Sequence, residues 1–347
     1  MSNEMQINEF RNRLKNGDFS GWYIFAGEED YLKKHYLGEL KKSILPDGDP
    51  FAFFNILSFD GDGVDFAAVR EAIESPPMMS EYKLIEWKYA NLDALKEGEK
   101  TELEELFSLK KEYPYAIFAI MSLSDGFNTG TAKKPSKLAE RLSSGFDILC
   151  FEKSTEPQLL SWLKRHFDAE EISADQRTLN SLIFRSGRSM QILAEEVKKL
   201  VAYAKANGRS AITEKDVETV ASPSAECDAF ALSNAVLDKN TDAAFAALAD
   251  LKQRRVEASV VVAMLSRTYS ELASVAFLLE EGKGSSDIET ELKFHPFKAK
   301  LYINSAKKAG AKKLTLCLAE LRKIDALSKS GSYLGYGPVE MFITKTF

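Results

Sequence analysis

The chain has 347 residues, which is too long for one ordinary hydrophobic core and predicts two or three domains. Hydrophobic residues make up 45% and charged residues 28%, a balance that excludes an intrinsically disordered chain. The formal net charge of −6 excludes a protein that coats nucleic acid through its overall charge.

The three cysteines, Cys150, Cys227 and Cys317, stand far apart in apolar surroundings. Their spacing matches no metal site, and three cysteines cannot close a disulfide framework. The N-terminal MSNEMQINEF lacks the pattern of a signal peptide, and no apolar run approaches the roughly 20 residues that span a bilayer. We therefore expect a cytoplasmic protein without a membrane partner.

Residues 1–152 alternate between two hydrophobic periods. Short apolar segments predict strands at 22–26, 52–59, 83–87, 116–121 and 146–151. Helical periodicity predicts helices at 31–45, 66–74, 92–109 and 135–142. The run YAIFAIM is apolar on both faces of a strand, which is typical of a parallel sheet covered by helices on both sides. The predicted fold class of this part is α/β with a doubly wound parallel sheet.

No convincing strand follows, and the rest of the chain is predicted to be all-helical. Thr155 begins a helix with a proline in its first turn and a glutamine at the capping-box position. Further helices are predicted from a cap at Ser173, over 190–206 and from Thr213. These helices predict a small domain over residues 153–222.

A Ser-Pro-Ser linker at 222–224 separates this region from a second helical domain over residues 223–347. Its helices are predicted at 228–237, 241–254, 258–281, 296–308 and 312–328, with a short one from Pro338. The segment 258–281 is apolar almost throughout, which indicates burial in its own bundle or against other subunits.

The C-terminal part is basic although the whole chain is acidic. From Glu291 to Phe347 it carries 11 Lys and Arg against 4 Asp and Glu. This pattern fits a solvated helical surface, and it also fits an anionic partner. The composition leaves both interpretations open.

The stretch GEEDYLKK, residues 27–34, joins a predicted strand to a helix, where α/β proteins commonly bind phosphate. The phosphate-binding pattern GxxxxGK[ST] needs a second glycine, a lysine for the β/γ-phosphates and a hydroxyl for the metal ion. Gly27 starts this pattern correctly, but Leu32 stands where the second glycine belongs. Lys33 and Lys34 follow, and the hydroxyl is absent.

The same turn carries the carboxylates of Glu28, Glu29 and Asp30. They suit the positive end of the helix dipole and oppose the binding of an anionic phosphate. We therefore expect no nucleotide and no other cofactor at this position.

Other signals of catalysis or metal binding are weak. Glu86 is isolated in a strand, and Asp125 comes several residues too late to complete a magnesium site. His35, His166 and His295 have no Cys, Ser or Asp companion in the sequence. We expect no catalytic and no metal-binding residue, and the sequence indicates an enzyme-like fold without an active site.

Two short motifs remain. In Ser-Pro-Pro-Met-Met-Ser, residues 75–80, Met78 and Met79 cannot both face inward from a tight loop. Adaptable apolar side chains on a rigid turn suit a protein-binding wedge, and the alternative is that they cover the end of the sheet. In residues 186–189, SGRS, an arginine stands at the head of a helix, where it is structural or points at a neighbouring subunit.

Six segments together resemble the delta-subunit family of bacterial DNA polymerase III, in the family's order and over almost the whole chain. They are YIFAGEEDYLKK, PPMMSEYKLIEW, SGRSMQILAEEVKKLVAYA, AFALSNAVLDKNTDAAFAALADLKQRR, FHPFKAK and LRKIDALSKSG. The resemblance implies an AAA+-like architecture of the P-loop NTPase type. It would comprise an α/β domain without a functional P-loop (1–152), a helical lid (153–222) and a helical collar that joins subunits (223–347).

The resemblance also implies a function in DNA replication. Members of the family bind and open the beta sliding clamp for loading onto primed DNA, beside delta prime and tau/gamma subunits of the clamp loader. They belong to a nucleotidyltransferase holoenzyme but do not bind ATP. The family's clamp-binding wedge falls on Met78 and Met79, with Pro77 before them, although a leucine or phenylalanine pair is usual there. Tyr333 and Tyr336, in the loop SYLGYG, are candidates for stacking on a DNA base.

Two alternatives stay open from the sequence. One is an ATP-binding subunit of the same superfamily with a degenerate loop. The other is a helical nucleic-acid-binding regulator that uses the basic block.

Overall fold

The computed structural model describes residues 3–45, 48–131, 133–329 and 335–345. The chain forms two compact units, Met1–Thr155 and Glu156–Phe347, and each is described by itself. The division falls at 155/156, close to the boundary predicted at 152/153. The further boundary at 222/223 stays a prediction.

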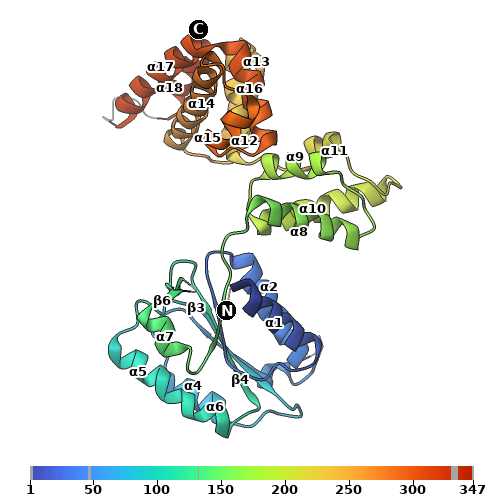
Figure 1. Ribbon diagram of the computed structural model, residues 1–347, viewed down its shortest axis with the longest axis vertical. Coiled ribbons are helices and arrows are strands. Elements are labelled where there is room, and N and C mark those ends of the chain that lie inside the picture. Colours follow the sequence, from blue (N-terminus) through green and yellow to red (C-terminus); the bar gives the residue numbers. More distant parts are fainter. Residues whose placement is uncertain (1–2, 46–47, 132, 330–334, 346–347) are drawn as a thin grey trace. The chain divides into compact units, whose positions relative to one another are not determined.

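A five-stranded sheet forms the centre of the first unit, and all of its strand pairs are parallel (Figure 1). The strands are β1 (Tyr23–Ala26), β2 (Ile56–Asp60), β3 (Lys83–Ala90), β4 (Ala116–Ser122) and β7 (Asp147–Cys150). Their spatial order is β2-β3-β4-β1-β7, so β2 and β7 form the edges. A separate antiparallel pair is formed by β5 (Gly130–Thr131) and β6 (Lys134–Pro135).

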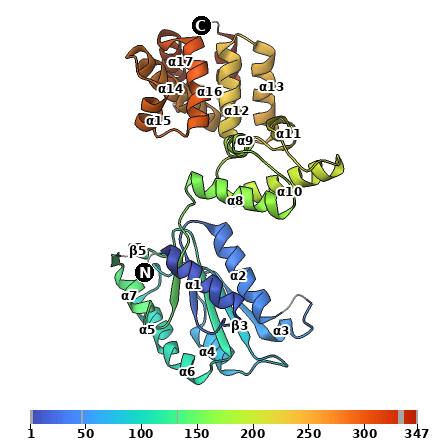
Figure 2. The ribbon, with the colours of Figure 1, turned by 45° about the vertical axis from the view of Figure 1, so that its right-hand side comes forward.

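Helices cover both faces of this sheet (Figures 1 and 2). One layer contains α1 (Asn3–Lys15) and α2 (Asp30–Ile44), and the other contains α4 (Phe66–Glu74), α5 (Glu97–Glu105), α6 (Leu109–Glu112) and α7 (Lys137–Leu142). A 3-10 turn, η1 (Leu106–Ser108), joins α5 to α6. Successive side chains of β1 alternate between the layers: Tyr23 and Phe25 pack with the first layer and Ile24 with the second. The α/β fold predicted for this part is confirmed.

The segment 52–59 is not one strand, as the sequence predicts, but two elements. The single helical turn α3 (Ala52–Asn55) precedes β2. Aromatic residues favour strands, so the run FAFF reads as part of one. The carboxylate of Asp49, however, accepts a hydrogen bond from the Phe51 N–H at 2.7 Å, and this turn starts the helix instead.

The second unit begins with α8 (Glu156–Ala169), α9 (Gln176–Ser186), α10 (Met190–Ala206) and α11 (Glu214–Val220). The sequence predicts a cap at Ser173, which is wrong. Asp175 caps α9, because its carboxylate accepts a hydrogen bond from the Thr178 N–H at 2.7 Å and also suits the helix dipole. Ser173 instead forms an isolated bridge with Ala211.

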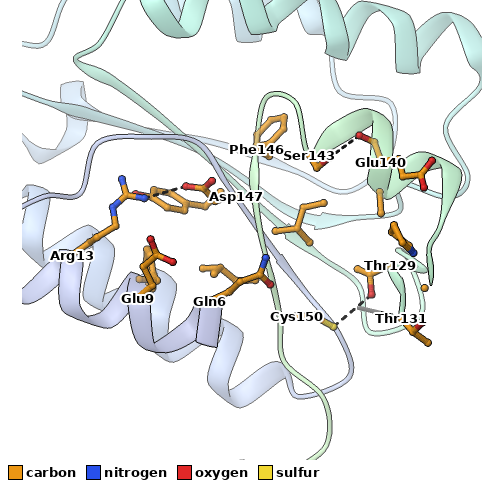
Figure 3. A pocket seen from close by; sticks show the side chains of 17 residues that line it. Gln6, Glu9, Arg13, Thr129, Thr131, Glu140, Ser143, Phe146, Asp147 and Cys150 are labelled. Atoms are coloured by element: carbon orange, nitrogen blue, oxygen red, sulfur yellow. Dashed lines mark hydrogen bonds and ion pairs between the residues drawn. The ribbon is translucent and has the colours of Figure 1, made fainter. Parts of the chain in front are cut away.

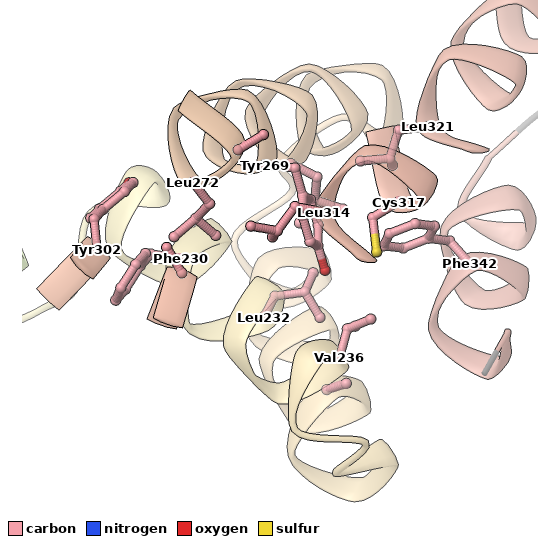
Figure 4. Packing of buried hydrophobic residues seen from close by; sticks show 14 of the residues in the cluster. Phe230, Leu232, Val236, Tyr269, Leu272, Tyr302, Leu314, Cys317, Leu321 and Phe342 are labelled. Atoms are coloured by element: carbon pink, nitrogen blue, oxygen red, sulfur yellow. The ribbon is translucent and has the colours of Figure 1, made fainter. Parts of the chain in front are cut away.

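The remaining helices form a bundle around one long helix. They are α12 (Ala225–Leu237), α13 (Thr241–Gln253), α14 (Ala258–Glu280), α15 (Ser285–Leu292), α16 (Pro296–Ala309), α17 (Ala311–Lys329) and α18 (Gly337–Thr344). The sequence predictions omit α1 and α15, which carry few apolar residues. Figure 4 shows Tyr269 and Leu272 of α14 facing Leu314 of α17 and Leu232 of α12. The hydroxyl of Tyr269 donates a hydrogen bond to the carbonyl of Ser233 at 3.2 Å.

By length and composition, α14 is long and apolar enough to cross a membrane, with a mean hydropathy of 1.2 over 18 residues. Half of that window is buried inside the protein, and core helices pass the same test. Leu265, Tyr269 and Leu272 are fully buried. Of the two alternatives that the sequence left open, burial in its own bundle or against other subunits, the structure shows burial in the bundle for these side chains.

Replacement of a fully buried side chain in α14 is expected to destabilise the second unit. Leu272→Ala leaves a cavity and should lower the free energy of unfolding by about 2–5 kcal/mol. Phe277→Ala, on the same helix but 49% exposed, should cost less than about 1 kcal/mol. Chemical denaturation followed by circular dichroism measures both, and equal losses would contradict this packing.

Candidate functional site

The turn after β1, where a nucleotide phosphate would bind, is closed by the end of β7. Gly27 has a φ of +97°, and a side chain there would overlap the backbone of Phe151. The Phe151 carbonyl accepts a hydrogen bond from the Glu29 N–H at 2.9 Å, and the Phe151 N–H donates one to the Ala26 carbonyl at 2.8 Å. The turn's amide at Glu29 is therefore bound to protein rather than open to a ligand.

Lys33, at the lysine position of the phosphate-binding pattern, is fully buried. Its ammonium group donates a hydrogen bond to the Ser122 carbonyl at 2.8 Å, at the carboxyl end of β4. It also pairs with the Asp30 carboxylate at 2.8 Å. Partial burial opposes ionisation of Asp30, but the hydrogen bond and charge of Lys33 hold the pKa of that carboxyl below its usual value. The positive charge of Lys33 is thus balanced by Asp30, three residues earlier in the chain.

A cavity of about 530 Å³ lies over this turn and has an acidic lining. Glu28, Asp125 and Glu152 lie along it with Lys153, whose ammonium is 3.3 Å from the Glu28 carboxylate. Burial raises the pKa of Glu29, which lies in this turn. The carboxylates of Glu28, Asp125 and Glu152 repel a phosphate group, which supports the expectation that no nucleotide binds here.

Glu86, the candidate metal ligand on β3, is buried among its own partners. It lies 3.4 Å from the Lys41 ammonium and 3.0 Å from that of Lys88, and it accepts a hydrogen bond from Ser58. Although burial opposes ionisation, these partners lower its pKa. Within the part of the chain that the structure describes, no group of three or more His, Cys, Asp and Glu side chains is arranged to hold a metal ion.

The histidines have local structural contacts. The His35 ring stacks on Tyr31, the His166 ring lies 4.0 Å from that of Trp162, and His295 accepts a hydrogen bond from the first turn of α16. These contacts give each ring a packing or capping role.

A second cavity of about 420 Å³ follows the edge strand β7 between α1 and α7 (Figure 3). Arg13 pairs there with Asp147 at 3.1 Å, and Thr129 lies 3.6 Å from the Cys150 sulfur. Burial raises the pKa of the Cys150 thiol, which keeps it protonated and poorly nucleophilic. The cavity therefore offers no activated nucleophile at Cys150.

The SPPMMS loop presents its methionines to solvent. Met79 is 81% exposed and Met78 46% exposed, while Pro77 is half-buried. Met79 has a φ of +54°, a conformation that residues other than glycine rarely adopt. Met79 therefore does not cover the end of the sheet, whereas Met78 is partly buried.

Two buried side chains hold this loop in place. The amide of Asn55 donates a hydrogen bond to the Met78 carbonyl at 2.8 Å and accepts one from the Met78 N–H at 2.7 Å. The Lys83 ammonium donates to the Ser75 carbonyl at 2.8 Å and to its hydroxyl at 2.6 Å. Burial lowers the pKa of Lys83. Sequence reasoning missed Asn55, since a single polar residue after FAFF gives no hint of a distant partner.

The loop lies at the opposite end of the sheet from the Gly27 turn. It precedes β3 and α3 precedes β2, and the two strands are parallel neighbours with Ile56 opposite Leu84. The Gly27 turn follows β1 in the same parallel sheet. The exposed methionines therefore stand at the amino ends of the strands.

Of the two candidate DNA-stacking residues, Tyr333 lies outside the described residues. The Tyr336 hydroxyl donates a hydrogen bond to the Val256 carbonyl, and the Lys252 ammonium lies 5.0 Å from the ring centroid. Its ring is half-buried against the bundle core. These contacts give Tyr336 a packing role, and base stacking by it stays a prediction.

The SGRS motif contributes to the helix ends around it. Gly187 has a φ of +86° and ends α9, and Ser189 caps α10. The Ser186 hydroxyl donates a hydrogen bond to the Ser222 carbonyl at 3.0 Å. Arg188 is exposed between them.

Comparisons with known proteins match both units. Residues 23–134 match the family model "DNA polymerase III, delta subunit", and residues 226–346 match "DNA polymerase III delta subunit, C-terminal domain". The DNA polymerase III subunit delta of Bacillus subtilis is 21% identical over 323 residues, covering 92% of this chain and 90% of the relative. The solved Bacillus subtilis DNA clamp loader delta protein shares the fold, with a TM-score of 0.57, 20% identity and coverage of 97% and 98%.

Removal of the Asp30 carboxylate is expected to destabilise the first unit. Asp30→Asn removes the negative charge that pairs with buried Lys33, and it should lower the free energy of unfolding by about 1–2 kcal/mol at pH 7. This loss is smaller than the roughly 3–5 kcal/mol of a fully buried pair, because Asp30 is half-exposed. The pKa of Asp30 is lower in the folded chain than in the unfolded one, so its contribution is present above about pH 4 and lost as the pH falls through the folded value.

Urea denaturation at pH 7 and near pH 3 measures this difference. The exposed pair of Glu28 supplies the control, and Glu28→Gln should change the stability little. A destabilisation by Asp30→Asn that stays the same at both pH values would contradict the assignment.

Titration with Mg²⁺-ATP is expected to give no saturable binding, because Lys33 is engaged inside the protein. Isothermal titration calorimetry measures this directly. Tight, Mg²⁺-dependent binding that Lys33→Met abolishes would favour the alternative of an ATP-binding subunit.

Proposed function

The chain belongs to the DNA polymerase III delta-subunit family, and we propose that it binds the beta sliding clamp and opens it for loading onto primed DNA. The observation that carries the proposal is the pair Met78 and Met79, exposed on a loop that buried side chains hold in place. The solved relative is named a DNA clamp loader delta protein, which supports the same role.

The chemistry of the loop suits the capture of an apolar pocket. A methionine side chain is flexible and polarisable, so it adapts to an irregular surface. The loop backbone is already fixed by Asn55 and Lys83, which reduces the entropy lost on binding. Pro77 restricts the backbone immediately before the pair.

The closed turn at Gly27 supports a subunit that does not respond to ATP itself. In this proposal the chain has no active site of its own and is moved by neighbouring subunits, delta prime and tau/gamma, within a cytoplasmic assembly. Residues 153–222 would serve as the lid, and residues 223–347 as the collar that joins the subunits. Primed DNA would be contacted within the complex.

Met78→Ala/Met79→Ala is expected to weaken binding to the beta sliding clamp by at least tenfold, because an interface anchor loses most of its apolar contact area. Surface plasmon resonance with the purified clamp measures the affinity. Met5→Ala removes a methionine that is also exposed, at 59%, in the same unit, and should leave the affinity unchanged. A double variant that binds as tightly as the unchanged chain would refute the wedge.

A further inference from the structure

A pair of aromatic side chains is exposed on the turn α3. Phe53 is 84% exposed and Phe54 is 52% exposed. Their rings meet edge to face, with centroids 5.6 Å apart and an interplanar angle of 84°. Single exposed apolar residues are common on protein surfaces, whereas an adjoining group of them marks a site of interaction.

The turn α3 is joined directly to the SPPMMS loop. Asn55, the residue after Phe54, is fully buried and makes both of its amide hydrogen bonds to the backbone of Met78. The strands that follow the two segments are neighbours, since β2 pairs with β3. The aromatic pair and the methionine pair therefore project from two backbones that are bonded together.

These two segments hold most of the exposed apolar side chains of the first unit. In its described part, six large hydrophobic side chains are exposed: Met5, Phe53, Phe54, Met78, Met79 and Tyr89. Four of the six come from α3 and the loop. Neither FAFFN (51–55) nor SPPMMS (75–80) contains a charged residue, and interface cores are likewise depleted of charge.

We propose that Phe53 and Phe54 form a second half of the clamp-binding surface, continuous with Met78 and Met79. The inference rests on the proposed function, and the occupant is the same sliding clamp. In this proposal, the clamp presents an apolar pocket to the methionines and an uncharged apolar rim to the two rings.

The two pairs contribute in different ways. A methionine has several rotatable bonds and loses rotamer freedom when it is bound, which costs free energy. A phenylalanine has two side-chain torsions, and here each ring already packs against the other. The rings therefore supply rigid contact area beside an adaptable pair, and they orient the clamp on the loop.

The test uses the full chain and the purified sliding clamp, with affinity measured by surface plasmon resonance. Phe53→Ala/Phe54→Ala is expected to weaken binding by about tenfold or more, and Phe53→Lys alone should weaken it similarly by placing a charge in the surface. Phe277→Ala, which removes an exposed phenylalanine from the second unit, should have no effect. Thermal unfolding of each variant checks that its fold is intact.

The outcomes separate this inference from the proposed function. If the methionine variant loses binding while both phenylalanine variants bind normally, the inference is wrong and the proposed function stands. If neither pair affects binding, the inference and the methionine wedge are both wrong, and a chain that does not bind the clamp at all would refute the proposed function itself. If the phenylalanine variants bind the clamp normally but lose another clamp-loader subunit, the rings serve a different partner, and the inference is again overturned.

Discussion

The burial of one positive charge at the carboxyl end of the sheet determines how this protein is organised. Lys33 is enclosed between Asp30 and the Ser122 carbonyl, and the backbone of Phe151 closes the turn above it. At the edge where open α/β sheets usually bind ligands, the lysine is thereby enclosed, and the cavity over the turn is lined by carboxylates. An α/β unit closed in this way can place a binding surface elsewhere, and here four of the six exposed large apolar side chains in its described part stand at the other end of the strands.

Apolar periodicity was enough to predict the parallel sheet and most helices, since runs such as YAIFAIM depend only on burial. Periodicity does not predict the order of the strands, because strand order depends on pairing between segments far apart in the sequence. The aromatic composition of α3 predicts a strand, whereas the structure has a helical turn in which the Asp49 carboxylate accepts a hydrogen bond from the Phe51 N–H. Residue types left open whether the methionine loop is a wedge or covers the end of the sheet, and the family resemblance favours the wedge. The support of the loop by Asn55 spans 23 positions and leaves no local pattern.

The buried polar side chains of the first unit hold the backbone in place and take part in no reaction in the proposed function. Asn55, Lys83 and Glu86 are each almost fully enclosed and each has hydrogen-bonded or charged partners. Groups of this kind are costly unless they are paired, so they fix one arrangement of the backbone. Asn55 and Lys83 in this way hold the exposed methionine loop in one conformation.

At Met79 the left-handed backbone and the exposed side chain favour different residues. A glycine or asparagine would adopt φ +54° at lower cost, so the isolated chain gains stability by giving up this side chain. Contact with a partner favours keeping it. Selection for folding alone would therefore drift away from methionine here. Under the proposed function, the residue at position 79 of a related chain would record how strongly the clamp, rather than the fold, constrains it.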